Sequence, residues 1–123
     1  MKAVIRANYS NPASHGGSIV DTVLASQELT AEWLGELAVM RDRIKAMRGA
    51  LVSGLKSRGV EADFDFILQQ NGMFSFSGLN DEAVNTLREQ HAIYIVKGGR
   101  INVAGITPGN ADYLCDAVAG VLK

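Results

Sequence analysis

Along the first half of the chain the hydrophobic positions recur with helical spacing. Between residues 27 and 58 an apolar side chain returns every three or four positions, which predicts one long amphipathic helix. Acidic residues gather near its start and basic residues near its end, as the helix dipole favours, and Gly59 can end it in a left-handed conformation. The apolar face comprises Leu29, Trp33, Leu37, Met40, Ile44, Met47, Leu51 and Leu55.

A shorter helix is expected over residues 16–25. Its apolar residues fall at positions i, i+1, i+4 and i+5, so this helix should be well buried. Just before it, residues 8–12 are rich in side chains that favour turns, which predicts a loop. The apolar residues of the helix are Ile19, Val20, Val23 and Leu24.

In the second half the pattern changes to short runs separated by turn signals. Residues 72–78 alternate apolar and small polar side chains with a period of two, which predicts a half-buried strand. Residues 64–68 are consistent with a further short strand or an extended lead-in. Two apolar runs, 93–96 and 101–104, flank Gly98-Gly99, and both glycines accept the positive φ of a tight hairpin. The two runs are expected to pair antiparallel.

Two more helices complete the expected fold. Asn80 or Asp81 can cap a helix that continues through Arg88, and Pro108 suits the first turn of a last helix. The expected class is α+β, with long N-terminal helices followed by a small antiparallel or mixed sheet with helices packed on it. No repeat or linker divides the chain, so a single domain over residues 1–123 is expected. The buried stripe of the last helix would be Ala111, Leu114, Cys115, Val118 and Leu122.

The composition agrees with one ordinary globular domain. The chain has 123 residues, of which 47% are hydrophobic and 20% charged, and its net charge of -1 offers no overall field for nucleic acid or an anionic membrane. No apolar run approaches the ~18 residues of a membrane span and no signal peptide is visible, so a cytoplasmic protein is expected. Cys115 is the single cysteine, which excludes an intrachain disulfide and a cysteine-rich metal site.

Few side chains suggest catalysis. His15 and His91 have no partner at metal-ligand spacing, and no nucleophile-elbow motif surrounds Ser10. The basic residues between 41 and 48 are interleaved with Asp42 and lack aromatic neighbours for base stacking, so they are interpreted as a solvated helix face. The sequence therefore assigns no catalytic residue and no metal ligand.

Arg100 differs from the other basic residues because it follows two glycines at the mouth of the expected hairpin. A planar guanidinium in that place could present its donors to a carboxylate. Composition alone still favours an ordinary surface arginine over a ligand-binding one.

Three segments together resemble a known family. In their order and spacing they look like the C-terminal third of the class I pyridoxal-phosphate-dependent aminotransferases of the aspartate/aromatic type. The resemblance implies a homodimer in which a large domain holds pyridoxal phosphate and a smaller domain closes over the substrate. The three segments are residues 5–12 with His15-Gly16, residues 70–79 (QNGMFSFSGL), and residues 99–105 (GRINVAG) with Thr107-Pro108.

The resemblance also implies roles for five residues. Arg100 would grip the α-carboxylate of the substrate. Arg6 would reach into the neighbouring subunit's site to bind the side-chain carboxylate of a dicarboxylic substrate, without deciding between aspartate and aromatic substrates. Phe74 would line the substrate cleft, and Ser10 and Asn11 would lie near the cofactor phosphate of the partner subunit.

The serine-flanked lysine that forms the Schiff base in the family is absent. We therefore expect that the isolated chain neither binds pyridoxal phosphate covalently nor turns over, and that activity needs the missing large domain. In this interpretation residues 1–26 form an interface loop and a short helix, residues 27–58 the long interdomain helix, and residues 59–123 a small α+β subdomain. The lysines present are Lys2, Lys45, Lys56, Lys97 and Lys123.

Two functions stay open at the level of the sequence. One is the C-terminal domain of an aspartate or aromatic-amino-acid aminotransferase, which transfers an amino group between an amino acid and a 2-oxo acid. The other is a non-catalytic aminotransferase remnant that acts as an oligomerisation or binding module. An independent enzyme that uses Ser10 or His15 has no motif behind it. Without a large domain, part of the face from Leu29 to Met47 should be exposed, which predicts self-association through the long helix.

Overall fold

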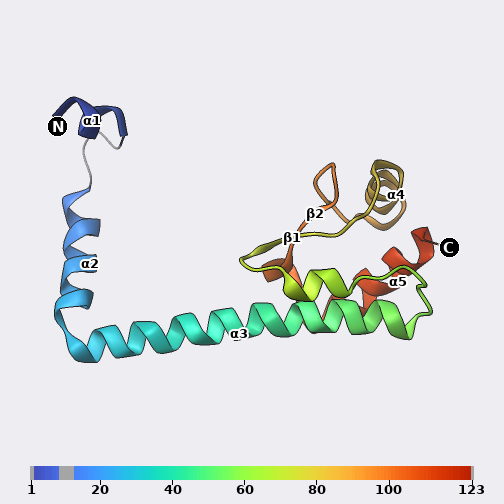
Figure 1. Ribbon diagram of the computed structural model, residues 1–123, viewed down its shortest axis with the longest axis horizontal. Coiled ribbons are helices and arrows are strands. Elements are labelled where there is room, and N and C mark those ends of the chain that lie inside the picture. Colours follow the sequence, from blue (N-terminus) through green and yellow to red (C-terminus); the bar gives the residue numbers. More distant parts are fainter. Residues whose placement is uncertain (1, 9–12, 123) are drawn as a thin grey trace. The chain divides into compact units, whose positions relative to one another are not determined.

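The computed structural model describes residues 2–8 and 13–122 of the chain. They form two compact units, one ending at Val39 and the other beginning at Met40, and the boundary lies within helix α3. The described elements are α1 (Lys2–Asn8), α2 (Ser14–Ala25), α3 (Gln27–Ser57), the 3-10 helix η1 (Asp65–Gln69), β1 (Phe74–Phe76), α4 (Asp81–His91), β2 (Arg100–Asn102), the 3-10 helix η2 (Val103–Gly105) and α5 (Ala111–Val121) (Figure 1). The expected α+β class, with helices first and then a small antiparallel sheet, is confirmed.

Helix α2 lies close to the expected range of 16–25, but the prediction that it is well buried is wrong. No residue of α2 is buried, and Ile19, Val20 and Leu24 are each more than half exposed. Periodicity shows that a helix has an apolar face, but it does not show that the same chain supplies a surface to cover that face. The predicted loop at residues 8–12 lies almost wholly outside the described residues.

The turn from α2 into α3 is held by side-chain hydrogen bonds. The hydroxyl of Thr30 donates to the carbonyl oxygen of Val23 at 2.8 Å, and Ser26 Oγ accepts from the backbone N–H of Leu29 at 3.3 Å. Ser26 therefore occupies the N-terminal capping position that serine favours, where it satisfies a backbone donor with no partner inside the helix.

Helix α3 has almost the predicted extent, and Gly59 follows it with a φ of +72° as expected. The first half of its apolar face is exposed, including Leu29, Trp33, Leu37 and Met40. Further along, Leu51 and Leu55 are buried in the core of the second unit. The expectation that part of this face is uncovered is thus confirmed for the first half of the helix.

The core of the second unit lies between the C-terminal half of α3 and the elements that follow it. Figure 1 shows η1 and α5 along this half of α3, and α4 packs against α5. Burial of these aliphatic side chains is the main stabilising contribution to the unit. The core includes Leu51, Val52 and Leu55 of α3, Ile67 of η1, Val84 and Leu87 of α4, Val103 of η2, and Cys115 and Val118 of α5.

Side-chain hydrogen bonds determine where the two later helices begin. Asn80 caps α4 as predicted, because its Oδ1 accepts from the backbone N–H of Ala83 at 2.8 Å. Helix α5 begins at Ala111, later than predicted, because Asn110 closes a preceding turn by accepting from the backbone N–H of Thr107 at 2.7 Å. Most of its predicted stripe faces the core, whereas Leu122 is exposed.

Residues 64–68 form neither the short strand nor the extended lead-in that the sequence suggested. They belong largely to the 3-10 helix η1, which begins where Asp63 Oδ1 accepts from the backbone N–H of Asp65 at 2.8 Å. An aspartate that bonds the backbone two residues ahead turns the chain and competes with extended structure. The apolar run still reaches the core through Phe64 and Ile67, by helical rather than strand geometry.

The expected hairpin forms its turn but not its ladder. Gly98 and Gly99 have the predicted positive φ angles, yet residues 93–96 pair with β2 only through one isolated bridge, Val96 to Arg100. The backbone N–H of Ile93 is taken by the carbonyl oxygen of Leu87 at the end of α4. The two segments separate around a cavity of about 390 Å³. Instead, β2 pairs antiparallel with β1, which is more distant in sequence.

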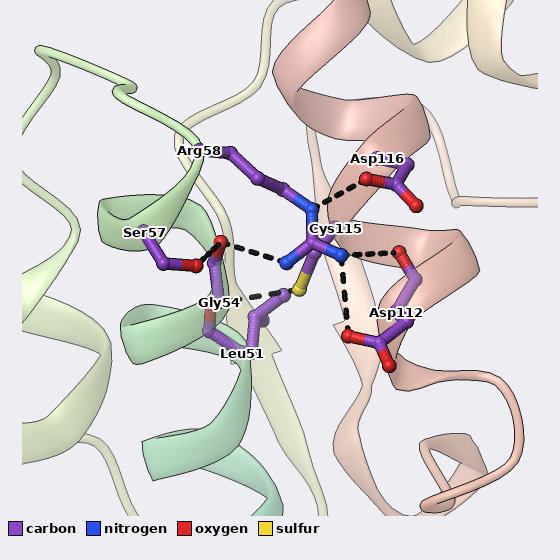
Figure 2. Close-up of polar contacts among 7 residues, drawn as sticks. All are labelled: Leu51, Gly54, Ser57, Arg58, Asp112, Cys115 and Asp116. Carbon is purple, nitrogen blue, oxygen red and sulfur yellow. Dashed lines mark hydrogen bonds and ion pairs between the residues drawn. The ribbon is translucent and has the colours of Figure 1, made fainter.

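Arg58, just after α3, ties this helix to α5 (Figure 2). Its Nε donates to Asp116 at 2.6 Å, its Nη2 to Asp112 at 3.1 Å, and its Nη1 to the carbonyl oxygen of Gly54 at 3.0 Å. The hydrogen bond with Asp116, followed by that with Asp112, raises the pKa of Arg58, and the guanidinium in turn lowers the pKa of Asp116. Cys115 lies between the two helices, where burial raises the pKa of its thiol.

The closeness of α3 and α5 at Cys115 predicts opposite effects for two glycine substitutions in α3. A Cβ at Gly54 would lie 2.6 Å from the sulfur of Cys115, so Gly54→Ala should lower the free energy of unfolding by about 1–3 kcal/mol. Nothing lies within 4 Å of a Cβ at Gly49, so Gly49→Ala should raise it by about 1 kcal/mol through helix propensity. Urea unfolding of both variants checks this, and equal effects of the two substitutions would refute the close contact.

Candidate functional site

Strand β1 and the residue that follows it bury their serines, while the aromatic side chains of β1 are exposed. Ser75 and Ser77 are 2% and 4% exposed, whereas Phe74 and Phe76 are 44% and 56% exposed. The alternating pattern correctly predicted a half-buried segment, but the buried half is polar. Buried hydroxyl groups need hydrogen-bond partners, and these partners define the candidate site.

Ser77 fixes the backbone immediately before Arg100. Its hydroxyl donates to the carbonyl oxygen of Gly99 at 2.6 Å, and its backbone N–H donates to the same oxygen at 2.8 Å. A Cβ at Gly99 would lie 2.8 Å from the carbonyl oxygen of Leu79 and 2.9 Å from Ser77 Oγ. Only glycine fits there without displacement, so the start of β2 is closely held against residues 77–79.

Arg100 and Phe74 come together on the exposed side of the ladder. Arg100 is opposite Phe76 in the register and Phe74 is opposite Asn102, so the two residues are diagonal neighbours across the strands. The guanidinium carbon of Arg100 lies 4.7 Å from the centre of the Phe74 ring, a cation–π arrangement. Among the described residues no carboxylate forms an ion pair with Arg100, so its donors are available to an anionic ligand.

The other residues implied by the resemblance lie elsewhere. Arg6 is exposed in the last turn of α1, in the first unit. Ser10 and Asn11 lie outside the described residues. Of the five, the structure brings together Arg100 and Phe74.

Sequence reasoning missed two arginines of α3 that hold the ladder. Arg48 is 3% exposed and donates through Nε to Ser75 Oγ at 3.0 Å and through Nη2 to the carbonyl oxygen of Gly72. Arg43 donates to the carbonyl oxygens of Ala104 at 3.2 Å and Ile106 at 2.8 Å, just after β2. The prediction of a solvated basic face is therefore wrong for Arg48.

The sequence does contain a signal for the burial of Arg48. It is four residues after Ile44 and four before Val52, so it shares the face of the helix that enters the core. A charged residue within an apolar stripe is buried only where hydrogen-bond partners meet it. Those partners come from β1, which the helix pattern alone does not reveal.

The described residues do not by themselves form a site for pyridoxal phosphate. A Schiff-base lysine is activated by desolvation or by a neighbouring cation. The four described lysines, Lys2, Lys45, Lys56 and Lys97, are all exposed, and Lys56 and Lys97 pair with Asp65 and Asp81. No step of the chemistry is therefore assigned through the cofactor.

Two other classes of site find no support in the part of the chain that the structure describes. There, no group of three or more His, Cys, Asp or Glu side chains is arranged to hold a metal ion. None of the helices formed by residues 2–8 and 13–122 has the length and hydropathy required to span a bilayer.

Comparison with known proteins connects this geometry to a family. Residues 1–118 match the family model described as aminotransferase class I and II. The chain is 57% identical to the aspartate aminotransferase of Haemophilus influenzae over 122 residues, which is 99% of this chain and 31% of that protein. It is 42% identical to the aromatic-amino-acid aminotransferase of Escherichia coli, again over 99% of this chain and 31% of the relative.

Solved structures that resemble this chain are also aminotransferases. The crystal structure of the aromatic-amino-acid aminotransferase from Burkholderia pseudomallei, covalently bound to pyridoxal phosphate, superposes with a TM-score of 0.93 at 56% identity. The match covers 98% of this chain and 30% of that one. A psychrophilic aromatic amino acid aminotransferase from Psychrobacter, cocrystallised with aspartic acid, gives a TM-score of 0.91 at 44% identity, with coverage of 98% and 30%. The chain thus spans somewhat less than a third of the relatives it matches.

The turn before Arg100 yields a prediction with a matched control. Gly99→Ala combines a positive φ with overlap against Leu79 and Ser77, so it should lower the free energy of unfolding by about 2–4 kcal/mol. Gly98→Ala has the positive φ but nothing within 4 Å, so it should cost about 1–2 kcal/mol. Chemical denaturation measures both, and a smaller loss for Gly99→Ala than for Gly98→Ala would contradict the packing described.

Proposed function

Because this chain belongs to the class I and II aminotransferases, we propose that it supplies the substrate-carboxylate arginines of an aspartate or aromatic-amino-acid aminotransferase. Such an enzyme transfers an amino group between an amino acid and a 2-oxo acid. The proposal concerns the whole enzyme. This chain corresponds to about 31% of the length of such a relative. The observation that carries it is the exposed guanidinium of Arg100, held over Phe74 on an anchored ladder.

Arg100 is proposed to bind the α-carboxylate. The amino acid and the 2-oxo acid both keep this group throughout the exchange, so one arginine serves both substrates. A planar guanidinium can bind a carboxylate with two parallel hydrogen bonds, which fix its orientation and contribute about 1.5–3 kcal/mol. Phe74 supports this role from below, since the ring restricts the rotamers of Arg100 while leaving its N–H edge accessible.

Arg6 is proposed to act in the neighbouring subunit of a homodimer. There it would bind the side-chain carboxylate of a dicarboxylic substrate, as the resemblance implies. Its exposed position at the end of α1 is compatible with reaching another chain. Ser10 and Asn11 are assigned to the surroundings of the cofactor phosphate by resemblance alone.

The amino-transfer chemistry itself is assigned to the part of the enzyme that this chain lacks. Pyridoxal phosphate supplies an electron sink in such enzymes and needs a reactive lysine beside it. The chain presents no lysine in that context. Its own residues bind and orient the substrate, and the isolated chain is expected to be inactive.

Reconstitution tests this proposal. The chain is mixed with the Haemophilus influenzae aspartate aminotransferase from which the segment matching this chain has been deleted, and aspartate-dependent transamination is measured. We expect activity to return, and Arg100→Ala to lower kcat/KM about 10- to 150-fold, the equivalent of 1.5–3 kcal/mol of carboxylate binding. Arg88→Ala is the control, because Arg88 lies on α4 and bonds only to Asn85 and Glu89 among the described residues.

Failure of reconstitution would favour the second function, a non-catalytic oligomerisation or binding module. The observation in favour of that function is the row of exposed apolar residues on the first half of α3. Full activity of Arg100→Ala in an active mixture would remove Arg100 from the substrate site.

We also propose that the isolated chain self-associates through this row. Uncovered apolar surface of this kind favours association, since burial is worth about 25 cal/mol per Å². Light scattering should find oligomers in the wild-type chain and a shift towards monomer in Leu37→Glu, because a charge at a half-exposed apolar position opposes burial. Glu36→Gln, on the neighbouring exposed position, should change nothing. A monodisperse wild-type monomer would contradict this proposal.

A further inference from the structure

Arg48 lies behind the ladder that carries Arg100. It belongs to α3, is 3% exposed, and donates to two points of the polypeptide around β1: the hydroxyl of Ser75 and the carbonyl oxygen of Gly72. We propose that Arg48 is a positioning residue, which sets the orientation of Arg100 for carboxylate binding by fixing β1 from its buried side. The inference rests on the substrate-binding role proposed for Arg100.

The connection from Arg48 to Arg100 is short and passes through hydrogen-bonded backbone. Ser75 is directly opposite Ile101, the residue next to Arg100. Phe74, whose ring lies against the Arg100 guanidinium, directly precedes Ser75 on β1. A displacement of Ser75 therefore moves both the strand that carries Arg100 and the ring on which Arg100 rests.

Two strands of three residues each have little stability of their own. On the buried side of the ladder β1 presents the hydroxyl of Ser75, and the apolar side chain on that side is Ile101 of β2, so β1 itself contributes no apolar side chain to the core. Hydrogen bonds with fixed directions hold it instead, and they specify position more sharply than apolar contact does. Arg43 gives a second attachment beyond the end of β2, through the carbonyl oxygens of Ala104 and Ile106.

The choice of arginine at this position is informative. Among the described residues Arg48 donates to neutral acceptors, so its desolvation is not offset by a carboxylate. A buried charge of this kind is weak support for stability, but its rigid fork reaches two acceptors at once. Lysine keeps the charge but has a single flexible donor head, so it separates the geometric role of Arg48 from its charge.

The first test follows the Arg100 guanidinium by NMR in the full 123-residue chain. In the wild type its Nε–H signal should be shifted upfield by the Phe74 ring, and Phe74→Leu gives the unshifted reference. Arg48→Lys and Ser75→Ala should each lose most of this shift. Arg41→Lys should not, because Arg41 is on the same helix but is exposed and paired with Asp42. Dispersed methyl signals of Leu87 and Val103 verify an intact core.

If Arg48→Lys does not fold, Ser75→Ala decides the question, since it removes one acceptor without touching the buried charge. Arg100 signals that stay at wild-type positions in the folded variants would overturn the proposal. Signals that move to the Phe74→Leu position would support it.

The second test uses a double-mutant cycle in the reconstituted enzyme. Arg48→Lys should lower kcat/KM about tenfold in the wild-type background and cause almost no further loss in the Arg100→Ala background, because coupled residues are not additive. Equal losses in both backgrounds would show a structural effect only and overturn the proposal. If the wild-type mixture is inactive, the proposed function fails, while the NMR test still decides whether Arg48 orients Arg100.

Discussion

The second unit depends on how a very short β-ladder is held in place. Strands β1 and β2 have three residues each, and β1 buries Ser75, opposite the buried Ile101 of β2. Directed hydrogen bonds, from Arg48 to Ser75 and from Ser77 to Gly99, hold β1 and the residue before β2. Such contacts tolerate little displacement. Because Ser75 is the buried residue of β1, Phe74 lies on the outer face, next to the guanidinium of Arg100.

This arrangement separates the rigid support from the guanidinium that we propose binds the substrate. The atoms that fix the backbone are buried, whereas the guanidinium of Arg100 is accessible and is oriented by the Phe74 ring. Binding sites gain affinity when the ligand-binding group is held beforehand, since less freedom is lost on binding. The same support therefore stabilises the fold locally and would prepare the carboxylate site that we propose at Arg100. In the proposed enzyme the rest of that site would come from residues outside this segment, which spans about 31% of its relatives' length.

Helix α3 shows the same incompleteness in its apolar face. Its second half is a central element of the core, where Leu51 and Leu55 are almost fully buried. Its first half exposes Trp33, Leu37 and Met40 with the same helical spacing. The same sequence pattern thus leads to two outcomes. Periodicity shows that the helix has an apolar face, but only packing against other elements buries that face.

What the sequence determined by itself was local. Helix periodicity, the Asn80 cap and the positive φ of Gly98 and Gly99 depend on neighbouring residues, and Arg100 was singled out by its place after those glycines. The tertiary structure decided which segments meet. It paired β2 with β1 rather than with residues 93–96, turned residues 65–69 into a 3-10 helix, and buried Arg48 against Ser75. Hydrogen bonds and packing between distant segments govern those outcomes, and no short window of sequence contains both partners.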